Sequence, residues 1–256
     1  MSLQRRWRSA RTSFSLPNAI TSAAVIGILI FAGVAAVKRH YISESTGIFL
    51  ACFVPAVIFH EVCHGVVALW CGDDTAKKAG RLTLNPLKHI DPFGSIILPI
   101  ILALTTGVPF GYAKPVPVNV SKLRRPRDDA VLVGLAGPTT NIVLTCLGGI
   151  ALHLLHTGLV VQGGLLYETH PQSVADQFAL SWGVVNIVLA VFNLIPIPPL
   201  DGSSLLERLL PARVLPEYYR LRFAFMIVVL IFVLYARGPV TSLLDHFENW
   251  YVEIFA

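Results

Sequence analysis

The sequence predicts an all-α polytopic membrane protein with five to six transmembrane helices. Two observations carry this prediction. The 256 residues are 54% hydrophobic and only 14% charged, with a mean hydropathy of +0.66, a composition typical of membrane proteins and not of soluble enzymes. The chain also contains several apolar runs that approach or exceed the roughly 20 residues a helix needs to cross the hydrocarbon core.

The first apolar run, about 18–37, follows four arginines and is longer than the hydrophobic part of a secretory signal. Because positive charge stays in the cytoplasm, we expect a transmembrane helix with a cytoplasmic N-terminus; a cleaved signal is the alternative. The runs 47–70, 130–156 and 178–197 are further crossings. The run 221–236 is shorter, but arginines at its ends can reach the interface, which favours a fifth crossing.

The run Ile96–Thr106 is too short to span the hydrocarbon unaided and contains Pro99. Basic linkers lie on both sides of it, and the positive-inside rule places both in the cytoplasm. We therefore predict a short re-entrant segment after the 47–70 helix, and a full crossing is the alternative.

The charge and the linkers limit the possible partners and domains. The net charge of +5 gathers near the predicted membrane ends, which indicates contact with the headgroups of a lipid bilayer. No basic stripe interleaved with aromatic residues is present, so no nucleic-acid binding is expected. No linker is long enough for a soluble domain. We expect one membrane-embedded domain over 1–256, with a core at about 47–202 and peripheral helices at 18–37 and 220–237; no pattern specifies an oligomeric state.

The motif His60-Glu61-Val62-Cys63-His64 lies inside the 47–70 run. Residues four apart share a helix face, so both imidazoles can reach one metal ion, with Glu61 beside the open metal position. Ionisable groups in a membrane segment cost several kcal/mol unless they are paired or bind metal. The motif therefore indicates function.

A catalytic zinc site usually has a third protein ligand, and Asp201 is the best candidate. It ends the segment NLIPIPPLDG, whose three prolines prevent a regular helix. Irregular backbone at membrane depth is tolerated only where it is buried or lines a cavity. A re-entrant 96–106 segment also places Asp201 on the same side of the membrane as His60 and His64. The alternative is a Pro-rich helix end with an Asp-Gly turn.

Together, HEVCH in a membrane helix and NLIPIPPLDG after a later one resemble the site-2 protease family of intramembrane zinc metalloproteases. The resemblance covers roughly Phe53 to Gly202 and is to the compact prokaryotic type without appended soluble domains. It extends to three further stretches: GRLTLNPLKHIDPFG (80–94), FGYAKPVPVNV (110–120) and AGPTTN (136–141).

The resemblance implies one Zn²⁺ ion with His60, His64 and Asp201 as ligands, and Glu61 as the catalytic general base. It also implies that Asn141 and Asn193 act near the scissile carbonyl, in oxyanion stabilisation or substrate positioning. For Asn141, interhelical hydrogen bonding is an equal alternative.

The implied activity is hydrolysis of peptide bonds within or near transmembrane segments of membrane protein substrates, by a multi-pass protein of the cell membrane. The family also implies a re-entrant β element between Arg81 and Val120, for which a simple cytoplasmic loop is the alternative. A different function is that of a catalytically silent relative, an adaptor that binds membrane helices. The presence of Glu61 favours the enzyme, because an adaptor needs no proton acceptor.

Overall fold

The fold is taken from a computed structural model of the chain. The structure describes residues 38, 43–91, 94, 113–155, 159–162, 165–168, 173–211, 213–235 and 237–255. The predicted first helix at 18–37 and the 96–106 segment lie outside these residues.

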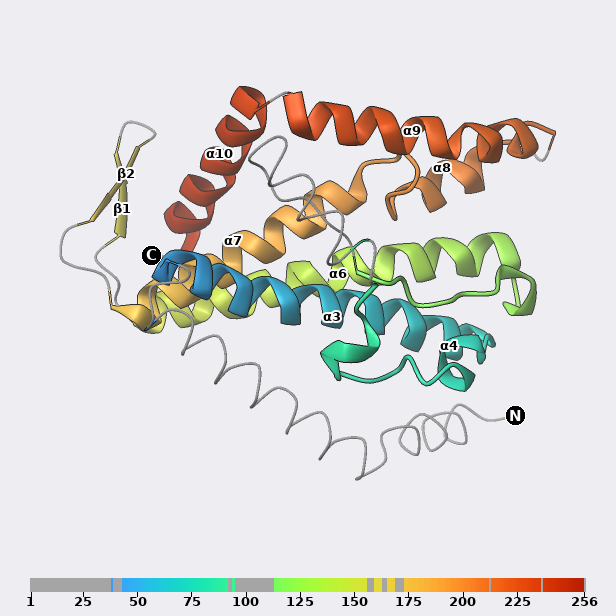
Figure 1. Cartoon of the computed structure of the whole chain (residues 1–256), viewed down its shortest axis with the longest axis horizontal. Coiled ribbons are helices and arrows are strands. Elements are labelled where there is room, and N and C mark those ends of the chain that lie inside the picture. Colours follow the sequence, from blue (N-terminus) through green and yellow to red (C-terminus); the bar gives the residue numbers. More distant parts are fainter. Residues whose placement is uncertain are drawn as a thin grey trace.

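Three long helices form the body of the molecule: α3 (Glu44–Cys71), α6 (Pro126–Leu154) and α7 (Val174–Leu194). All three pack against one another, as Figure 1 shows. Each is long and apolar enough to cross a membrane, which confirms the predicted membrane character and its mainly helical fold. A total of five to six crossings stays a prediction.

Local signals set where these helices begin and end. The Ser43 side chain accepts a hydrogen bond from the Thr46 N–H and so caps α3. Ser173 and Asp176 form a capping box at the start of α7. At its other end α3 stops at Gly72, whose φ of 114° is a conformation that suits glycine.

The interior of the bundle is made by small side chains. Cys52 and Ala56 of α3 are fully buried in a cluster with Val185 of α7, and Ala68 is buried in a second cluster with Val133 of α6. Small residues allow the helix backbones to approach closely, as in membrane bundles. The outer faces carry exposed apolar side chains, such as Leu147 and Ile150 of α6, which suits contact with lipid.

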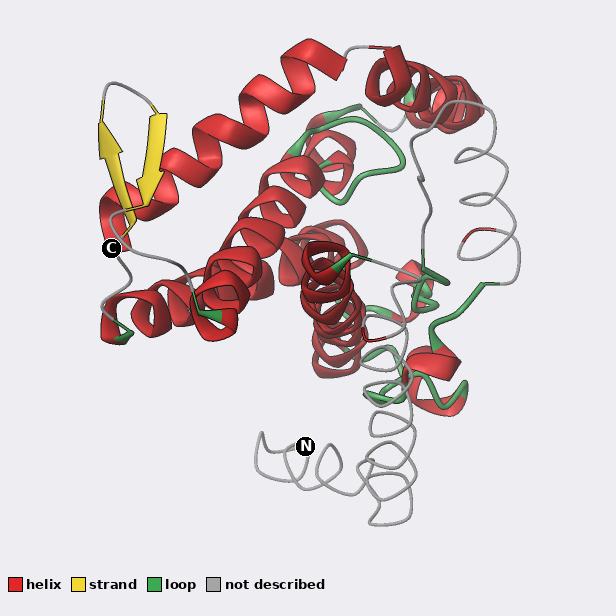
Figure 2. Cartoon of the chain, turned by 60° about the vertical axis from the view of Figure 1, so that its left-hand side comes forward, coloured by secondary structure: helices red, strands yellow, loops and turns green. Residues whose placement is uncertain are grey.

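Short elements gather at the end of the bundle that follows α3. They are α4 (Thr75–Lys78), the 3₁₀ turns η1 (Pro86–Lys88) and η3 (Val120–Lys122), and an irregular stretch, 113–119, between the two turns. Among the described residues of 81–120 no strand is assigned, so the re-entrant β element stays a prediction. The strands of the described chain are β1 (Leu159–Gln162) and β2 (Leu165–Glu168), an antiparallel hairpin between α6 and α7 (Figure 2).

Three helices follow α7: α8 (Ser203–Leu209), α9 (Leu215–Tyr235) and α10 (Arg237–Phe255). The last of these helices, α10, packs on α6 and α7. Tyr251 and Val252 of α10 are buried in this contact. The fifth crossing predicted at 221–236 falls within α9 and stays a prediction.

Candidate metal centre

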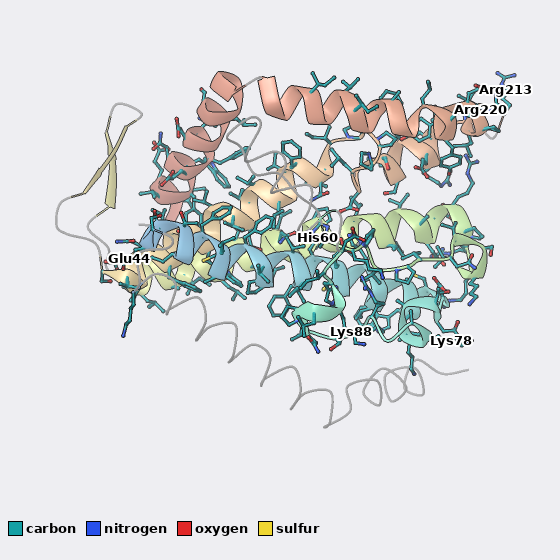
Figure 3. All side chains as sticks on the ribbon, in the orientation of Figure 1. Glu44, His60, Lys78, Lys88, Arg213 and Arg220 are labelled. Carbon is teal, nitrogen blue, oxygen red and sulfur yellow. The ribbon has the colours of Figure 1, made fainter. Side chains whose placement is uncertain are left out.

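Helix α3 places His60 and His64 one turn apart on its buried face, where they are 6% and 8% exposed. Their ring centroids lie 4.7 Å apart and the ring planes are nearly perpendicular. Figure 3 shows His60 in the interior of the bundle, between Glu44 at one end of α3 and Lys78 beyond the other. The helical spacing predicted from the motif is present.

Both imidazoles are held by hydrogen bonds at their Nδ1 atoms. His64 Nδ1 lies 2.6 Å from the carbonyl oxygen of Val133, and His60 Nδ1 lies 2.5 Å from Asn141 Oδ1. A carbonyl oxygen only accepts, so His64 Nδ1 carries the hydrogen and its Nε2 presents a lone pair. Partners of this kind orient metal-binding histidines in known metal sites.

The loop after α7 carries Asp201 back to the two histidines. It is closed by the Gly202 N–H, which donates to the Asn193 carbonyl at 2.7 Å. A Cβ on Gly202 would lie 2.6 Å from the carbonyl carbon of Leu194 and 2.7 Å from the oxygen of Ile195. The loop can therefore close this tightly because residue 202 has no side chain.

Helix α8, directly after the loop, is fastened to the start of α6. Arg208 Nε donates to Asp128 at 2.6 Å, and the Arg127 guanidinium donates to the Leu210 carbonyl at 2.5 Å. The Ser204 hydroxyl also donates to the Asp201 carbonyl at 2.8 Å. Of these contacts, the Ser204 bond holds the Asp201 backbone directly.

The Asp201 carboxylate meets both histidines. Its Oδ2 lies 2.8 Å from His60 Nε2 and 3.3 Å from His64 Nε2, and one ligand atom from each of the three residues lies within 4.8 Å of the others. Within the described ranges this is the group of histidine, cysteine and carboxylate side chains that is arranged to hold a metal ion.

The chemistry of this donor set fits a metal cation. Asp201 Oδ2 is buried and receives no hydrogen bond, and His64 Nε2 turns a lone pair toward it. A cation held between these atoms would remove the repulsion between the two acceptors. Two imidazole nitrogens and one carboxylate oxygen are a set that zinc takes in catalytic sites, with a fourth position open to water.

Helix α6 crosses directly over the two imidazoles at Gly137. A Cβ at this position would lie 2.5 Å from His60 Nε2 and 2.5 Å from His64 Nε2. Only glycine lets the backbone of α6 come this close to the imidazoles, because any side chain would fill the space in front of the nitrogens that face Asp201.

Glu61 points toward the segment 113–119. The Val116 N–H donates to Glu61 Oε2 at 2.8 Å. The segment is anchored by Arg81, a buried side chain that donates to the carbonyls of Lys114 at 2.5 Å and Pro115 at 3.3 Å, and also to that of Lys88. Burial lowers the pKa of the Arg81 guanidinium from its ordinary value, and the charge of Glu61 opposes this; arginine nevertheless stays protonated.

Two further carboxylates tie the same segment to the end of α3. Burial would raise the pKa of Asp73, but hydrogen bonds from Thr75 and from the Asn119 N–H at 2.6 Å outweigh it, and the pKa is lowered. Asp74 pairs with Lys78 and Lys122, which lowers its pKa to about 2. Both are therefore charged at neutral pH and hold the segment that contacts Glu61.

The two predicted asparagines have different surroundings. Asn141 is fully buried, with Oδ1 against His60 and Nδ2 donating to Asn186 Oδ1 of α7 at 2.8 Å. This is the interhelical hydrogen bonding that was its alternative role. Asn193 is half-buried at the end of α7, where its Nδ2 donates to the Leu189 carbonyl at 3.0 Å.

Sequence reasoning missed several contributors to the site. Asn186 had a visible signal, since it is an amide in the middle of an apolar helix and seven residues before Asn193, which places both on nearly the same face. The carbonyl of Val133 had no such signal, because every residue type has a backbone carbonyl. The role of Arg81 depends on its contacts with the Lys114 and Pro115 carbonyls, 33 and 34 residues away, and no short-range pattern predicts such contacts.

Comparisons with known proteins agree with this geometry. Residues 160–235 match the sequence model of Peptidase family M50. This chain is 42% identical over 175 residues to "Putative zinc metalloprotease YwhC" of Bacillus subtilis, a match that covers 68% of this chain and 74% of that protein. It is 30% identical over 165 residues to "Putative zinc metalloprotease Rip2" of Mycolicibacterium smegmatis, covering 63% and 58%.

A third relative is archaeal. "Putative zinc metalloprotease MJ0611" of Methanocaldococcus jannaschii is 27% identical over 150 residues, covering 59% of this chain and 64% of that protein. No solved structure matches. The family match includes Asp201 and its loop but not the HEVCH motif, so the motif and the match are separate observations.

Proposed function

This chain belongs to peptidase family M50, and on that premise we propose that it is a zinc-dependent intramembrane endopeptidase of the site-2 protease type. The observation that carries the proposal is the meeting of His60, His64 and Asp201 inside a bundle of apolar helices. These three residues would hold one zinc ion, and Glu61 would serve as general base.

The position of the site supports cleavage within the membrane. At 1.5 Å per residue, His60 lies roughly 24 Å from the start of α3 at Glu44 and roughly 17 Å from its end at Cys71. The site is thus inside the apolar helix and nearer to the end where Lys78, Arg213 and Arg220 lie in Figure 3. By the positive-inside rule this end is cytoplasmic.

We accordingly assign the chain to the cell membrane as a multi-pass protein with a cytoplasmic N-terminus. Its partners are the lipid bilayer and a transmembrane protein substrate. The arrangement we propose has five to six crossings, a re-entrant element after α3 and a single membrane-embedded domain, with its core at about 47–202.

The chemistry follows from the residues present. A zinc ion bound by the three ligands would lower the pKa of a water molecule toward neutrality and polarise the substrate carbonyl. Glu61 is held at Oε2 by the Val116 N–H, so we assign its Oε1 to accept the proton of the attacking water and to deliver it to the leaving amine. Asn193, half-buried beside the Asp201 loop, remains our candidate for contact with the substrate carbonyl.

Three variants test the mechanism. Glu61→Gln should retain zinc and lose cleavage, whereas His64→Ala and Asp201→Asn should lose zinc as well, because each removes one of three ligands. Zinc content is measured by elemental analysis of the purified protein. The matched control is Asp245→Asn, the same chemical change at an exposed carboxylate of α10, and it should keep zinc.

Cleavage is measured by comparing membrane-derived peptides in cells that express wild-type or Glu61→Gln protein. Peptides cut within transmembrane segments should be present only with wild-type protein. Equal peptide sets would remove the enzymatic proposal and leave the adaptor, which binds membrane helices without cutting them.

A further inference from the structure

Asn186 lies in the middle of α7, with no solvent exposure. Its Nδ2 donates to the Trp182 carbonyl, one turn earlier in the same helix, at 2.8 Å. A backbone carbonyl only accepts, so the amide nitrogen of Asn186 must face it. The side chain therefore has one orientation, in which Oδ1 points away from Trp182 and toward α6.

That oxygen meets Asn141 of α6. Asn141 Nδ2 donates to Asn186 Oδ1 at 2.8 Å, which leaves Asn141 Oδ1 to face His60 Nδ1 at 2.5 Å. The amide orientations in this chain are fixed by its first member, the Trp182 carbonyl, and not by the choice of an atom name. His60 Nδ1 thus carries the hydrogen, and its Nε2 turns a lone pair to the side of Asp201.

The two histidines differ in what keeps the hydrogen on Nδ1. His64 Nδ1 donates directly to the Val133 carbonyl, a backbone group that cannot become a donor. His60 relies on the side-chain amide of Asn141, and a half-turn of that amide would present an N–H to Nδ1 instead. The hydrogen would then move to Nε2, the atom that must hold the metal.

We propose that Asn186 is a positioning residue for the metal centre, because with Asn141 it links the Trp182 carbonyl to His60 and so keeps the imidazole hydrogen on Nδ1 and the lone pair of Nε2 toward Asp201. The inference rests on the proposed zinc site. It assigns a role to a residue that lies two side chains away from the ion and touches neither substrate nor metal. Partners of metal-binding histidines typically change metal affinity by about 10- to 100-fold when removed.

The test measures Zn²⁺ affinity of the purified full-length protein by competition with a chromophoric chelator. Asn186→Leu, similar in size but without hydrogen-bonding groups, should bind Zn²⁺ about 10-fold or more weakly than wild type. The matched control is Thr145→Val. Thr145 is buried at the same α6–α7 contact, and its hydroxyl donates to the carbonyls of Asn141 and Gly183, but it lies outside the link to His60 and should leave Zn²⁺ affinity unchanged.

A double-variant cycle separates positioning from general destabilisation. Because Asn186 acts only through Asn141, the pair Asn141→Leu/Asn186→Leu should bind Zn²⁺ no more weakly than Asn141→Leu alone. Losses that multiply in the pair would overturn the inference, as would Asn186→Leu protein with wild-type affinity. The visible spectrum of the Co²⁺-loaded protein provides a second readout, since its bands respond to the coordination geometry; it should change in Asn186→Leu and stay as in wild type in Thr145→Val.

A rescue variant examines the orientation itself. In Asn141→Asp a carboxylate accepts from His60 Nδ1 whichever way it turns, so the anchor at Asn186 is no longer needed. Asn186→Leu should therefore cost much less Zn²⁺ affinity in the Asn141→Asp background than in wild type, and an equal loss in both contradicts the inference.

Should the leucine variant not fold, Asn186→Ser carries the same expectation, because a serine hydroxyl can bond to the Trp182 carbonyl one turn earlier but is too short to reach Asn141. Wild-type protein that binds no Zn²⁺ would remove the proposed function and the inference together. Wild-type protein that binds Zn²⁺ no better than Asn186→Leu would remove the inference alone.

Discussion

Substitution of Gly137 by alanine should abolish tight zinc binding by adding a single methyl group. The new Cβ would lie 2.5 Å from the Nε2 atoms of both His60 and His64, whereas carbon and nitrogen atoms rest about 3.5 Å apart. The rings would have to retreat by about 1 Å. Metal-ligand distances tolerate changes of only about 0.2 Å, so at least one imidazole would leave the ion.

The retreat would also break the hydrogen bonds that hold the rings, at 2.5 Å to Asn141 and 2.6 Å to Val133. Loss of one such partner alone weakens metal binding about 10- to 100-fold. We therefore expect Zn²⁺ affinity to fall by about 100-fold or more, equivalent to about 2.8 kcal/mol. The assay is chelator competition on the purified protein, with thermal unfolding of the metal-free form measured alongside.

Gly149→Ala provides the control, because it makes the same change in the same helix away from the site. There the Cβ would clash with the ring of Phe255 in α10. It should lower stability by about 1–3 kcal/mol through overpacking and leave Zn²⁺ affinity intact. Gly137→Ala protein that binds Zn²⁺ within about threefold of wild type would refute the reasoning.

Two further substitutions test how the loops serve the site. Gly202→Ala would bring a Cβ against the backbone of Leu194 and Ile195, which cannot yield as a side chain can; the loop should open, and elemental analysis should find zinc lost as in Asp201→Asn. Arg81→Met keeps the length of the side chain but removes its bonds to the Lys114 and Pro115 carbonyls, so the Val116 N–H should no longer hold Glu61. Cleavage should fall about 10-fold or more while zinc content stays at the wild-type level, and a loss of zinc in this variant would contradict the role given to Arg81.

The apolar runs predicted the main helices, and the HEVCH motif predicted the pairing of the two histidines. The 47–70, 130–156 and 178–197 runs correspond to α3, α6 and α7, with ends shifted by a few residues because caps such as Ser43 and Ser173, and not hydropathy, set where a helix begins. Asp201 could be predicted because the prolines before it prevent a regular helix at membrane depth. Such an irregular segment must be buried against the bundle, which places its carboxylate near the other helices.

The rest of the site depends on tertiary contacts that residue type does not encode. The rotation of α6 about its axis decides whether Asn141 faces a substrate or another helix. A sequence pattern does not predict this rotation accurately enough to place a single side chain. The carbonyl of Val133, which accepts a hydrogen bond from His64 Nδ1, is a backbone group that any residue would supply. Gly137 is a glycine among several in the same helix, and only the crossing of α6 over α3 distinguishes it from Gly148.

The three proposed zinc ligands come from segments of the chain that leave the ribosome at very different times. His60 and His64 belong to α3, but Asp201 follows α7, and α6 with Gly137 must be in place between them. A nascent chain that has inserted α3 alone therefore presents two histidines and no complete site. If the proposed site holds zinc, metal capture is deferred until most of the chain has been made and packed, and an immature copy cannot cleave the newly inserted helices around it.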